Sequence, residues 1–354
     1  MSSKNETVEI REGEALDIAA IDPVLKAHIT GLTGTPVVTQ YPSGASNLTY
    51  AVDYPDRRLV LRRPPFGTRP KSGHDMHREY RIMTALKPNY SVPETLYYTD
   101  DESVIGAEFY VMERSEGHLI HTKIPKEWDW KAADARALCE EFFTKLVDLH
   151  MTDYKAIGLE DFGRPEGYVA RQIGGWNKRF EKAWTVDVDK FEDVRTWLDD
   201  NKPATERGAA ILHGDYRIDN CILNLKDPRK IDAVLDWEIS ALGDPMMDLG
   251  NTLSYWVQKG DPEFMQLTVR QPSQADGMMT RQEILDFYAE RTGQDVSNFQ
   301  FYYVYGIWRL AVIIQQIYYR YYHGQTKDKR FATYGQMATA LGEFARMKIK
   351  TGTL

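Results

Sequence analysis

The order in which strand-like and helix-like segments follow one another constrains the fold of this chain more than any other feature. One helical pattern, His77–Leu86, stops before Pro88, and a leading helix is expected over residues 14–31. Five runs around them have the composition of strands, namely Val37–Tyr41, Leu48–Val52, Leu59–Arg62, Thr95–Thr99 and Glu108–Glu113. Five strands with one helix between the third and the fourth predict a small α+β lobe.

From Trp130 onward the pattern becomes mostly helical. One helix is expected to end near His150, and further helices are expected at Gly167–Trp184, Phe191–Asp199, Met246–Gln258, Arg281–Arg291 and Tyr302–Tyr322. The sequence therefore predicts an α+β protein of two lobes. Residues 1–114 would form the β-rich N-terminal lobe and residues 115–354 the larger helical lobe.

Composition excludes several classes of partner. The chain has 354 residues and a formal net charge of −8, which argues against nucleic acid or an anionic membrane as the main partner. Tyr302–Tyr322 is apolar, but Arg309 lies inside it, so a buried core helix is expected rather than a membrane span. The N-terminus is polar and unlike a signal peptide, and Cys139 and Cys221 are far apart; we therefore expect reduced thiols and a cytoplasmic protein.

The stretch from Ile211 to Gly250 holds the residues best suited to chemistry. Its two apolar runs, Cys221–Leu225 and Ile231–Leu235, are joined by a polar link that contains Pro228, which predicts an antiparallel hairpin. A register symmetric about Pro228 would pair Cys221 with Leu235. The same register would place Asn220 opposite Asp236.

An amide oxygen and a carboxylate placed opposite each other suit a hard cation such as Mg²⁺. Asp215 precedes Asn220 on the loop that enters the hairpin, where its carboxylate could accept a proton. One acid beside two oxygen ligands for magnesium is the minimum that phosphoryl transfer requires. The alternative is that Asp215 and Asn220 only cap turns and Asp236 only ends a strand.

The motifs in this stretch resemble those of the aminoglycoside phosphotransferase and choline kinase superfamily. They are His213-Gly214-Asp215 with Asn220, then Leu235-Asp236-Trp237-Glu238, then Gly243-Asp244-Pro245 with Asp248-Leu249. The patterns Leu61-Arg62-Arg63-Pro64-Pro65 and Tyr168-Val169-Ala170-Arg171-Gln172 with Trp176 are similar to those of the phosphotransferase domains attached to acyl-CoA dehydrogenase family members ten and eleven. The resemblance runs from about Val37 to Trp256 and implies a protein-kinase-like fold.

By this resemblance Asp215 is the catalytic base, and Asn220 and Asp236 hold magnesium. Asp248 would brace the catalytic loop, although a residue at a helix start could equally cap free N–H groups. His213 is expected to be a packed scaffold residue. Glu238 is expected to be a solvated loop carboxylate, with contact to a second magnesium as the alternative.

The resemblance also assigns a nucleotide site to the N-terminal lobe. The turn after the first strand would cover the phosphates through its backbone N–H groups and the hydroxyls of Ser43 and Ser46, with Gly44 between them. A plain hairpin turn would look the same. Met112, Glu113 and Arg114 would form the hinge whose backbone meets the adenine.

The third strand carries Arg62 where the superfamily has a lysine that grips the α- and β-phosphates. Arginine can keep that role because it is permanently charged and binds phosphate as a planar fork. Glu79, on the following helix, is the natural partner that would hold Arg62 in place. A surface Arg–Glu pair is the alternative.

The acceptor pocket is expected to use Tyr168, Arg171, Gln172 and Trp176. If Gly167–Trp184 is a helix, the first three share one face, which offers a fixed cation between an amide and an aromatic ring. Such a face suits a carboxylate or a phosphate. The alternative is that Arg171 pairs with an acidic neighbour and pins the helix.

Together these features predict an ATP- and Mg²⁺-dependent kinase that acts on a hydroxyl group of a small molecule, for which a hydroxy acid or a hydroxyacyl-CoA is the expected class. A nucleotide-binding pseudokinase and an aminoglycoside-type antibiotic phosphotransferase are the alternatives. A protein kinase is disfavoured because the chain has no His-Arg-Asp loop and no Ala-Pro-Glu segment. A metal-dependent hydrolase would need a richer His/Asp cluster.

Overall fold

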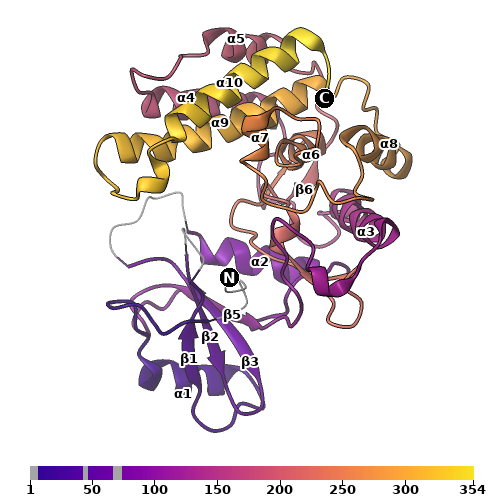
Figure 1. Cartoon of the computed structure of the whole chain (residues 1–354). Helices are drawn as coiled ribbons and strands as arrows, with labels where there is room; N and C mark the ends of the chain where they lie inside the picture. The colour runs from indigo at the N-terminus through magenta and orange to yellow at the C-terminus, as the bar shows by residue number, and fades with distance from the viewer. Residues whose placement is uncertain (1–6, 43–46, 67–73) are drawn as a thin grey trace. The chain divides into compact units, whose positions relative to one another are not determined.

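The computed structural model describes residues 7–42, 47–66 and 74–354 and divides into two compact units (Figure 1). The first unit holds the chain up to Ile120 together with Lys155–Leu159 and Asp219–Ser240. The second unit holds His121–Tyr154, Glu160–Ile218 and Ala241–Leu354. Each unit is described separately below.

An antiparallel five-stranded sheet forms the centre of the first unit, in the order β1-β2-β3-β5-β4. Two helices accompany it, α1 (Ile18–His28) and α2 (Met76–Leu86). The strands are β1 (Val37–Gln40), β2 (Leu48–Asp53), β3 (Arg58–Arg63), β4 (Thr95–Thr99) and β5 (Phe109–Glu113). This confirms the predicted strands and the helix between the third and the fourth. The predicted leading helix is shorter than expected at both ends.

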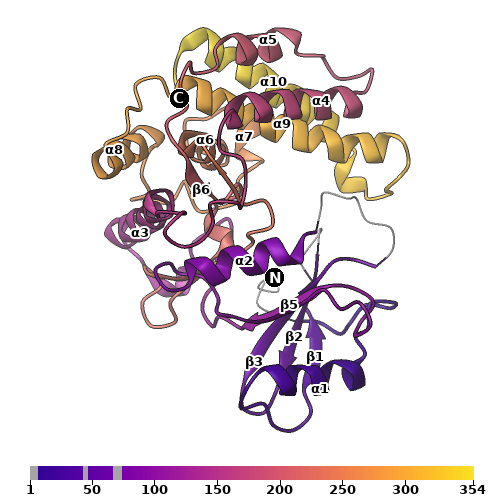
Figure 2. The ribbon, with the colours of Figure 1, turned by 180° about the vertical axis from the view of Figure 1, so that it is seen from behind.

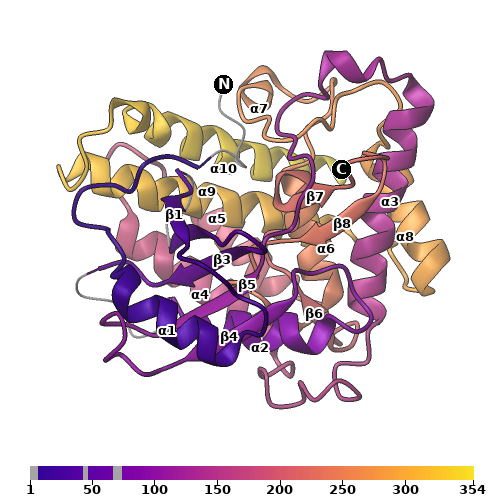
Figure 3. The ribbon, with the colours of Figure 1, turned by 90° about the horizontal axis from the view of Figure 1, so that it is seen from below.

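The alternation of side chains along the strands decides what each face of this sheet carries. Helix α1 packs on one face, where its Leu25 joins an apolar cluster with residues such as Leu61 of β3 and Val111 of β5 (Figures 1 and 3). The next residue of β3 is Arg62, and its partner across the ladder is Tyr110 of β5. Both therefore point away from the α1 face. The sheet thus separates an apolar core from a polar face.

A two-stranded hairpin, β7 (Cys221–Leu223) with β8 (Ile231–Val234), also belongs to the first unit. The predicted hairpin is confirmed, but its predicted register is wrong by one residue. Cys221 pairs with Val234 rather than Leu235. Next to the link, Leu223 pairs with Ile231, which centres the hairpin on Asp227 rather than Pro228, and an irregularity between Ile222 and Leu223 then shifts one strand by one residue.

The altered register changes how the hairpin ends. Leu235 donates its N–H to the carbonyl of Asn220 at 2.8 Å, so these two residues face each other through their backbones. Asp236 follows with φ of 70°, in the left-handed region that aspartate tolerates better than most residues. The chain therefore leaves the strand at Asp236, at the same end of the hairpin as Asn220.

The second unit is mostly helical, and its helix α9 touches α4, α5, α6 and α10 (Figures 1 and 2). A short pair of antiparallel strands, β6 (Ala210–Leu212) and β9 (Ala241–Gly243), accompanies the helices. The helices are α3 (Ala132–Met151), α4 (Tyr168–Ala183), α5 (Glu192–Asp200), α6 (Pro245–Ser254), α7 (Glu263–Gln266), α8 (Arg281–Thr292), α9 (Gln300–Tyr322) and α10 (Tyr334–Thr351). Short 3-10 turns occur at Lys126–Trp128, Ile218–Asn220 and Lys329–Phe331. The predicted α+β class, with a small antiparallel sheet and a larger helical part, is confirmed.

Glycines allow α6 and α9 to approach closely. A Cβ at Gly250 of α6 would lie 2.3 Å from the carbonyl oxygen of Tyr302, and one at Gly306 of α9 would lie 2.3 Å from the carbonyl oxygen of Gly250. Most of α9 is buried inside the unit, as the expected core helix. Among the residues that the structure describes, no helix has both the length and the apolarity needed to cross a bilayer.

Candidate active site

In the first unit, Arg62 and Glu79 form a buried ion pair. The Nη1 of Arg62 lies 2.9 Å from the Oε2 of Glu79, and the Glu79 side chain is only 1% exposed. Tyr110 donates its hydroxyl to the same carboxylate at 2.6 Å. Burial raises the pKa of Glu79, and the charge of Arg62 opposes that rise. The pair is therefore part of the interior, not the surface pair that was the alternative.

Asn47 extends this network toward the end of the hairpin. Its Nδ2 donates to Glu79 at 3.3 Å and to Glu238 at 3.0 Å, and its Oδ1 lies 2.8 Å from the Nδ1 of His74. Asn47 is almost fully buried, whereas the Glu238 side chain is a quarter exposed. Glu238 is therefore held by a side-chain hydrogen bond and is not the freely solvated carboxylate that was expected.

Arg62 is the residue of this network best suited to bind phosphate. Its Nη2 lies 3.6 Å from Asp236 and 3.8 Å from Glu238, and its Nε is buried with no hydrogen-bond acceptor among the described residues. Burial alone would lower the pKa of Arg62, but Glu79 and the other nearby groups hold it well above its usual value. A permanent cation with an unused buried donor fits a phosphate group.

Asn220 and Asp236 offer an amide and a carboxylate at the same end of the β7–β8 hairpin. Asn220 is 5% exposed, and the Asp236 side chain is 38% exposed. Within the described ranges, no group of three or more His, Cys, Asp or Glu side chains could hold a metal ion by itself. Two protein oxygens fit a magnesium ion that takes its other ligands from phosphate and water.

The residues predicted to form the hinge lie at the end of β5, where the backbone N–H groups of two of them already form hydrogen bonds. Glu113 donates its N–H to the carbonyl of Glu94 at 2.8 Å, and Arg114 donates its N–H to the carbonyl of Arg58 at 2.9 Å. These two N–H groups are therefore already paired. The contact of Met112, Glu113 and Arg114 with adenine stays a prediction. Ser43, Gly44 and Ser46 lie outside the described residues.

In the second unit, the His213-Gly214-Asp215 turn follows β6 directly. Gly214 has φ of 84°, a conformation that glycine adopts without strain. His213 is fully buried, and its Nδ1 accepts the N–H of Asp215 at 3.2 Å. His213 therefore shapes the turn from inside, which is the scaffold arrangement expected for it.

Asp248 holds the same turn through two backbone hydrogen bonds. Its Oδ2 accepts the N–H of His213 and its Oδ1 accepts the N–H of Gly214, both at 2.8 Å. The N-terminus of α6 is capped instead by Asp244, which accepts the N–H of Met246. Asp248 therefore has the geometry of a brace rather than a cap.

His150, near the end of α3, contacts the Asp248 carboxylate. Its Nε2 lies 3.3 Å from Asp248 and its Nδ1 lies 2.8 Å from the hydroxyl of Tyr288. Burial would raise the pKa of Asp248, but His150 and the backbone of His213 hold it below its usual value. The brace is therefore an ionised, fully buried carboxylate.

Asp215 projects from this turn with its side chain 22% exposed. Arg217 places its Nη2 3.3 Å from the Asp215 carboxylate and lies over the ring of Tyr255 at 5.1 Å. On the other side of the turn, Arg309 of α9 donates its Nη2 to the carbonyl of Gly214 at 2.9 Å. The turn that carries Asp215 is therefore held by an anion, Asp248, and a cation, Arg309.

The four residues predicted for the acceptor pocket lie on α4, as expected. Trp176 donates its Nε1 to the side chain of Gln172 at 3.2 Å, and the ring of Tyr168 lies against Gly243, where a Cβ would come within 2.5 Å of it. Arg171 is exposed, and it donates to the backbone carbonyls of Glu166 and Arg164. Arg171 therefore holds the entry to its own helix, through carbonyls rather than an acidic neighbour.

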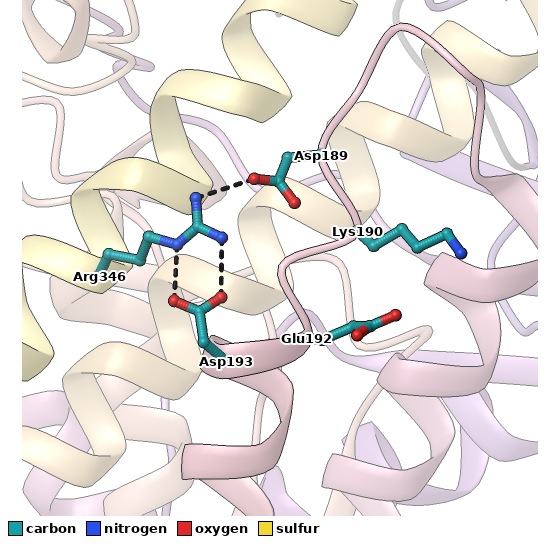
Figure 4. Close-up of a pocket in the computed structure, with 5 residues that line it drawn as sticks. All are labelled: Asp189, Lys190, Glu192, Asp193 and Arg346. Atoms are coloured by element: carbon teal, nitrogen blue, oxygen red, sulfur yellow. Dashed lines mark hydrogen bonds and ion pairs between the residues drawn. The ribbon is translucent and has the colours of Figure 1, made fainter.

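A hollow on the second unit lies among charged residues from the loop before α5, from α5 and from α10 (Figure 4). Arg346 donates to both oxygens of Asp193, at 2.7 and 2.8 Å, and to Asp189 at 3.0 Å. Lys190 and Glu192 complete the lining. Arg346 therefore pairs with two of the three carboxylates that line the hollow.

From the sequence we assigned no role to four residues that hold the Arg62–Glu79 network and the turn of Asp215, namely Asn47, Tyr110, His150 and Arg309. Tyr110 could have been found from strand pairing, because it lies opposite Arg62 in the ladder. Arg309 left a signal as a charged residue inside an apolar helix. Asn47 and His150 make contacts with residues far away in the sequence, which no local pattern predicts.

The sequence matches the phosphotransferase enzyme family (APH) over residues 37–283, and the chain belongs to this family. Mouse acyl-CoA dehydrogenase family member 10 is 32% identical over 343 residues, which is 96% of this chain and 32% of that protein. The chain thus spans about a third of the length of that relative.

Solved structures share the fold. A Ralstonia eutropha protein provisionally assigned as an aminoglycoside phosphotransferase has 29% identity and a TM-score of 0.81, over 95% of this chain and 99% of its own. Choline kinase from Cryptosporidium parvum has 14% identity and a TM-score of 0.65, over 95% of this chain and 97% of its own. The fold is therefore that of the aminoglycoside phosphotransferases and choline kinases.

Proposed function

We propose that the chain is an ATP- and magnesium-dependent kinase that transfers a phosphoryl group to a hydroxyl group of a small molecule. The observation that carries this proposal is the buried Arg62–Glu79 pair, in which Arg62 keeps an unused buried N–H donor near Asp236. Arg62 thus holds a permanent positive charge beside Asp236, and the phosphates of a nucleotide would accept from its remaining donors. Membership of the phosphotransferase family supports the same activity.

Asp215 is the proposed general base. Its carboxylate would take the proton from the acceptor hydroxyl as the oxygen attacks the terminal phosphorus of ATP. The new P–O bond forms while the bond from that phosphorus to the bridging oxygen breaks, and ADP leaves with the electron pair. Asp248 and His213 hold the turn so that the Asp215 carboxylate is fixed before the acceptor arrives.

Asn220 and Asp236 are the proposed ligands of magnesium, which would neutralise charge on the phosphates when bound. Arg62, held by Glu79, would bind the phosphates next to them. Ser43, Gly44 and Ser46 are proposed to cover the phosphates, and Met112, Glu113 and Arg114 to flank the adenine. The acceptor pocket is proposed to draw on Tyr168, Arg171, Gln172 and Trp176.

A hydroxy acid or a hydroxyacyl-CoA is the proposed acceptor class. The similarity to acyl-CoA dehydrogenase family member 10 supports a substrate with an acyl group. An aminoglycoside is the second candidate, because the chain is similar to the Ralstonia eutropha structure.

The test is an ADP-release assay of the purified full chain with Mg-ATP and four groups of acceptors: hydroxy acids, hydroxyacyl-CoA esters, amino alcohols and aminoglycosides. Binding of ATP with and without magnesium is measured in parallel by isothermal titration calorimetry. The proposal expects magnesium-dependent ATP binding and acceptor-dependent ADP release. A chain that binds Mg-ATP but phosphorylates no member of the four groups would favour the pseudokinase alternative, and a chain that does not bind it would contradict both.

A further inference from the structure

A buried arginine beside the turn that carries the proposed base forms no ion pair with a carboxylate of the described residues. Arg309 is only 7% exposed, and the one hydrogen bond that it makes to a described residue goes to the carbonyl of Gly214, the residue before Asp215. Of the residues that the structure describes, none forms an ion pair with Arg309. A guanidinium has five N–H donors, so most of its hydrogen-bonding capacity is not used.

Another buried arginine of the same unit shows the usual arrangement. Arg281 is 2% exposed and pairs through both of its Nη atoms with the carboxylate of Asp261. Burying a cation without such a partner is unfavourable, which is why buried charges are normally paired. Arg309 therefore lacks the paired carboxylate that a buried arginine normally has.

The position of Arg309 follows from the close packing of α6 and α9. Gly306 lies one turn before it on α9, and the absence of a Cβ there lets α9 approach Gly250 of α6. The same approach brings Arg309 to the carbonyl of Gly214, whose N–H is held by Asp248 of α6. The cation is therefore fixed beside Asp215 by the packing of two helices.

Several aromatic side chains lie near the guanidinium. It lies 5.2 Å from the ring of Trp176 on α4. The other ionisable groups that interact with its charge are Tyr255, Tyr305, Tyr168 and Asp215. Asp215 is the one carboxylate among these groups, and it forms an ion pair with Arg217 rather than with Arg309. The tyrosine and tryptophan side chains can pack around an organic ligand.

We propose that Arg309 binds an anionic group, a carboxylate or a phosphate, on the acceptor whose hydroxyl is presented to Asp215. This inference rests on the proposed function and deepens it, because it makes Arg309 a specificity-determining residue for anionic acceptors. Such an acceptor supplies the missing counter-ion. A cationic acceptor such as choline or an aminoglycoside would place like charges side by side.

Arg171, the cation first expected to do this, is turned toward the backbone carbonyls of Glu166 and Arg164 and is exposed. Arg309, by contrast, is buried and donates to the residue before Asp215.

The experiment compares pairs of acceptors that differ mainly in one anionic group. The pairs are 3-hydroxybutyrate with its methyl ester, and glycerol 3-phosphate with glycerol; choline and kanamycin represent cations. ADP release gives kcat and KM, and calorimetry gives the binding of each probe to the full chain. Wild type should bind and phosphorylate an anionic member in preference to its neutral partner.

The variant Arg309→Gln should reduce kcat/KM for the preferred anionic acceptor by about 10- to 100-fold, mainly through KM, because a charge-assisted contact is lost. The neutral partner should change little, so the preference within the pair collapses. Arg309→Lys should retain part of the preference. Arg320→Gln, an exposed arginine farther along α9, is the matched control and should behave as wild type.

Several results would overturn the inference. One is equal use of charged and neutral partners by wild type, which needs no variant and holds even if Arg309→Gln fails to fold. Another is an equal loss for both partners in Arg309→Gln, since this would mean that Arg309 only positions the Gly214 carbonyl. The absence of binding by every anionic probe would also overturn it. Failure of Mg-ATP to bind in the same samples would instead contradict the proposed function.

Discussion

Replacing Glu79 with glutamine tests whether the Arg62–Glu79 pair holds the first unit together. The substitution keeps the shape of the side chain but removes a charge that is 1% exposed and lies 2.9 Å from Arg62. Breaking a buried ion pair by removing one partner typically costs about 3–5 kcal/mol. Asp236 and Glu238 remain within 4 Å of Arg62 and would compensate in part, so the lower end, about 3 kcal/mol, is expected.

The matched control is Glu116→Gln, which breaks the exposed pair between Glu116 and Arg58 at 2.8 Å. Both of these side chains are at least half exposed, so the loss should be below about 1 kcal/mol. Urea denaturation followed by circular dichroism gives the free energy of unfolding of each variant. A loss for Glu79→Gln no greater than that for Glu116→Gln would refute the reasoning, because it would mean that the buried pair contributes no more than a surface pair.

Three further predictions concern packing and titration. Cys139 and Cys221 should resist iodoacetamide in the native chain and react in urea, because burial raises the pKa of Cys139 to about 12 and that of Cys221 well above its usual value; native alkylation would contradict their burial. Gly250→Ala should lower stability by about 1–3 kcal/mol in the same urea assay, because its Cβ would lie 2.3 Å from the carbonyl oxygen of Tyr302; unchanged stability would contradict the close helix packing. Hydrogen bonds from Arg136 and from Thr280, at the start of α8, lower the pKa of Glu283 to about 2. Glu283→Gln should therefore reduce the melting temperature at neutral pH, and the difference in melting temperature from wild type should vanish as the pH falls from about 4.5 toward 2. A difference that persists near pH 2 would contradict this.

The sequence predicted the elements well where a pattern was local. The composition of short runs located all five strands of the sheet, and the helical pattern located α4 and α9 within a few residues. From the sequence we predicted no helix at the position of α10.

Long-range features were harder to obtain. The register of β7 and β8 depends on an irregularity at Ile222 and Leu223, which a symmetric pairing about Pro228 cannot anticipate. The contacts of Asn47 and His150 depend on tertiary packing. The sequence placed Arg309 in a buried helix, but only the structure shows that it contacts Gly214, the residue before Asp215.

The central claim is that Asp215 acts as a base while Asp236 binds magnesium, and one measurement tests these separate roles directly. The rate of ADP release is titrated with magnesium at fixed ATP and acceptor for wild type, Asp215→Asn and Asp236→Asn. Asp215→Asn should lose acceptor phosphorylation while binding Mg-ATP as wild type does, because a base contributes little to nucleotide affinity. Asp236→Asn should require much more magnesium for both nucleotide binding and turnover. An unchanged magnesium dependence in Asp236→Asn, or full phosphorylation by Asp215→Asn, would contradict the account.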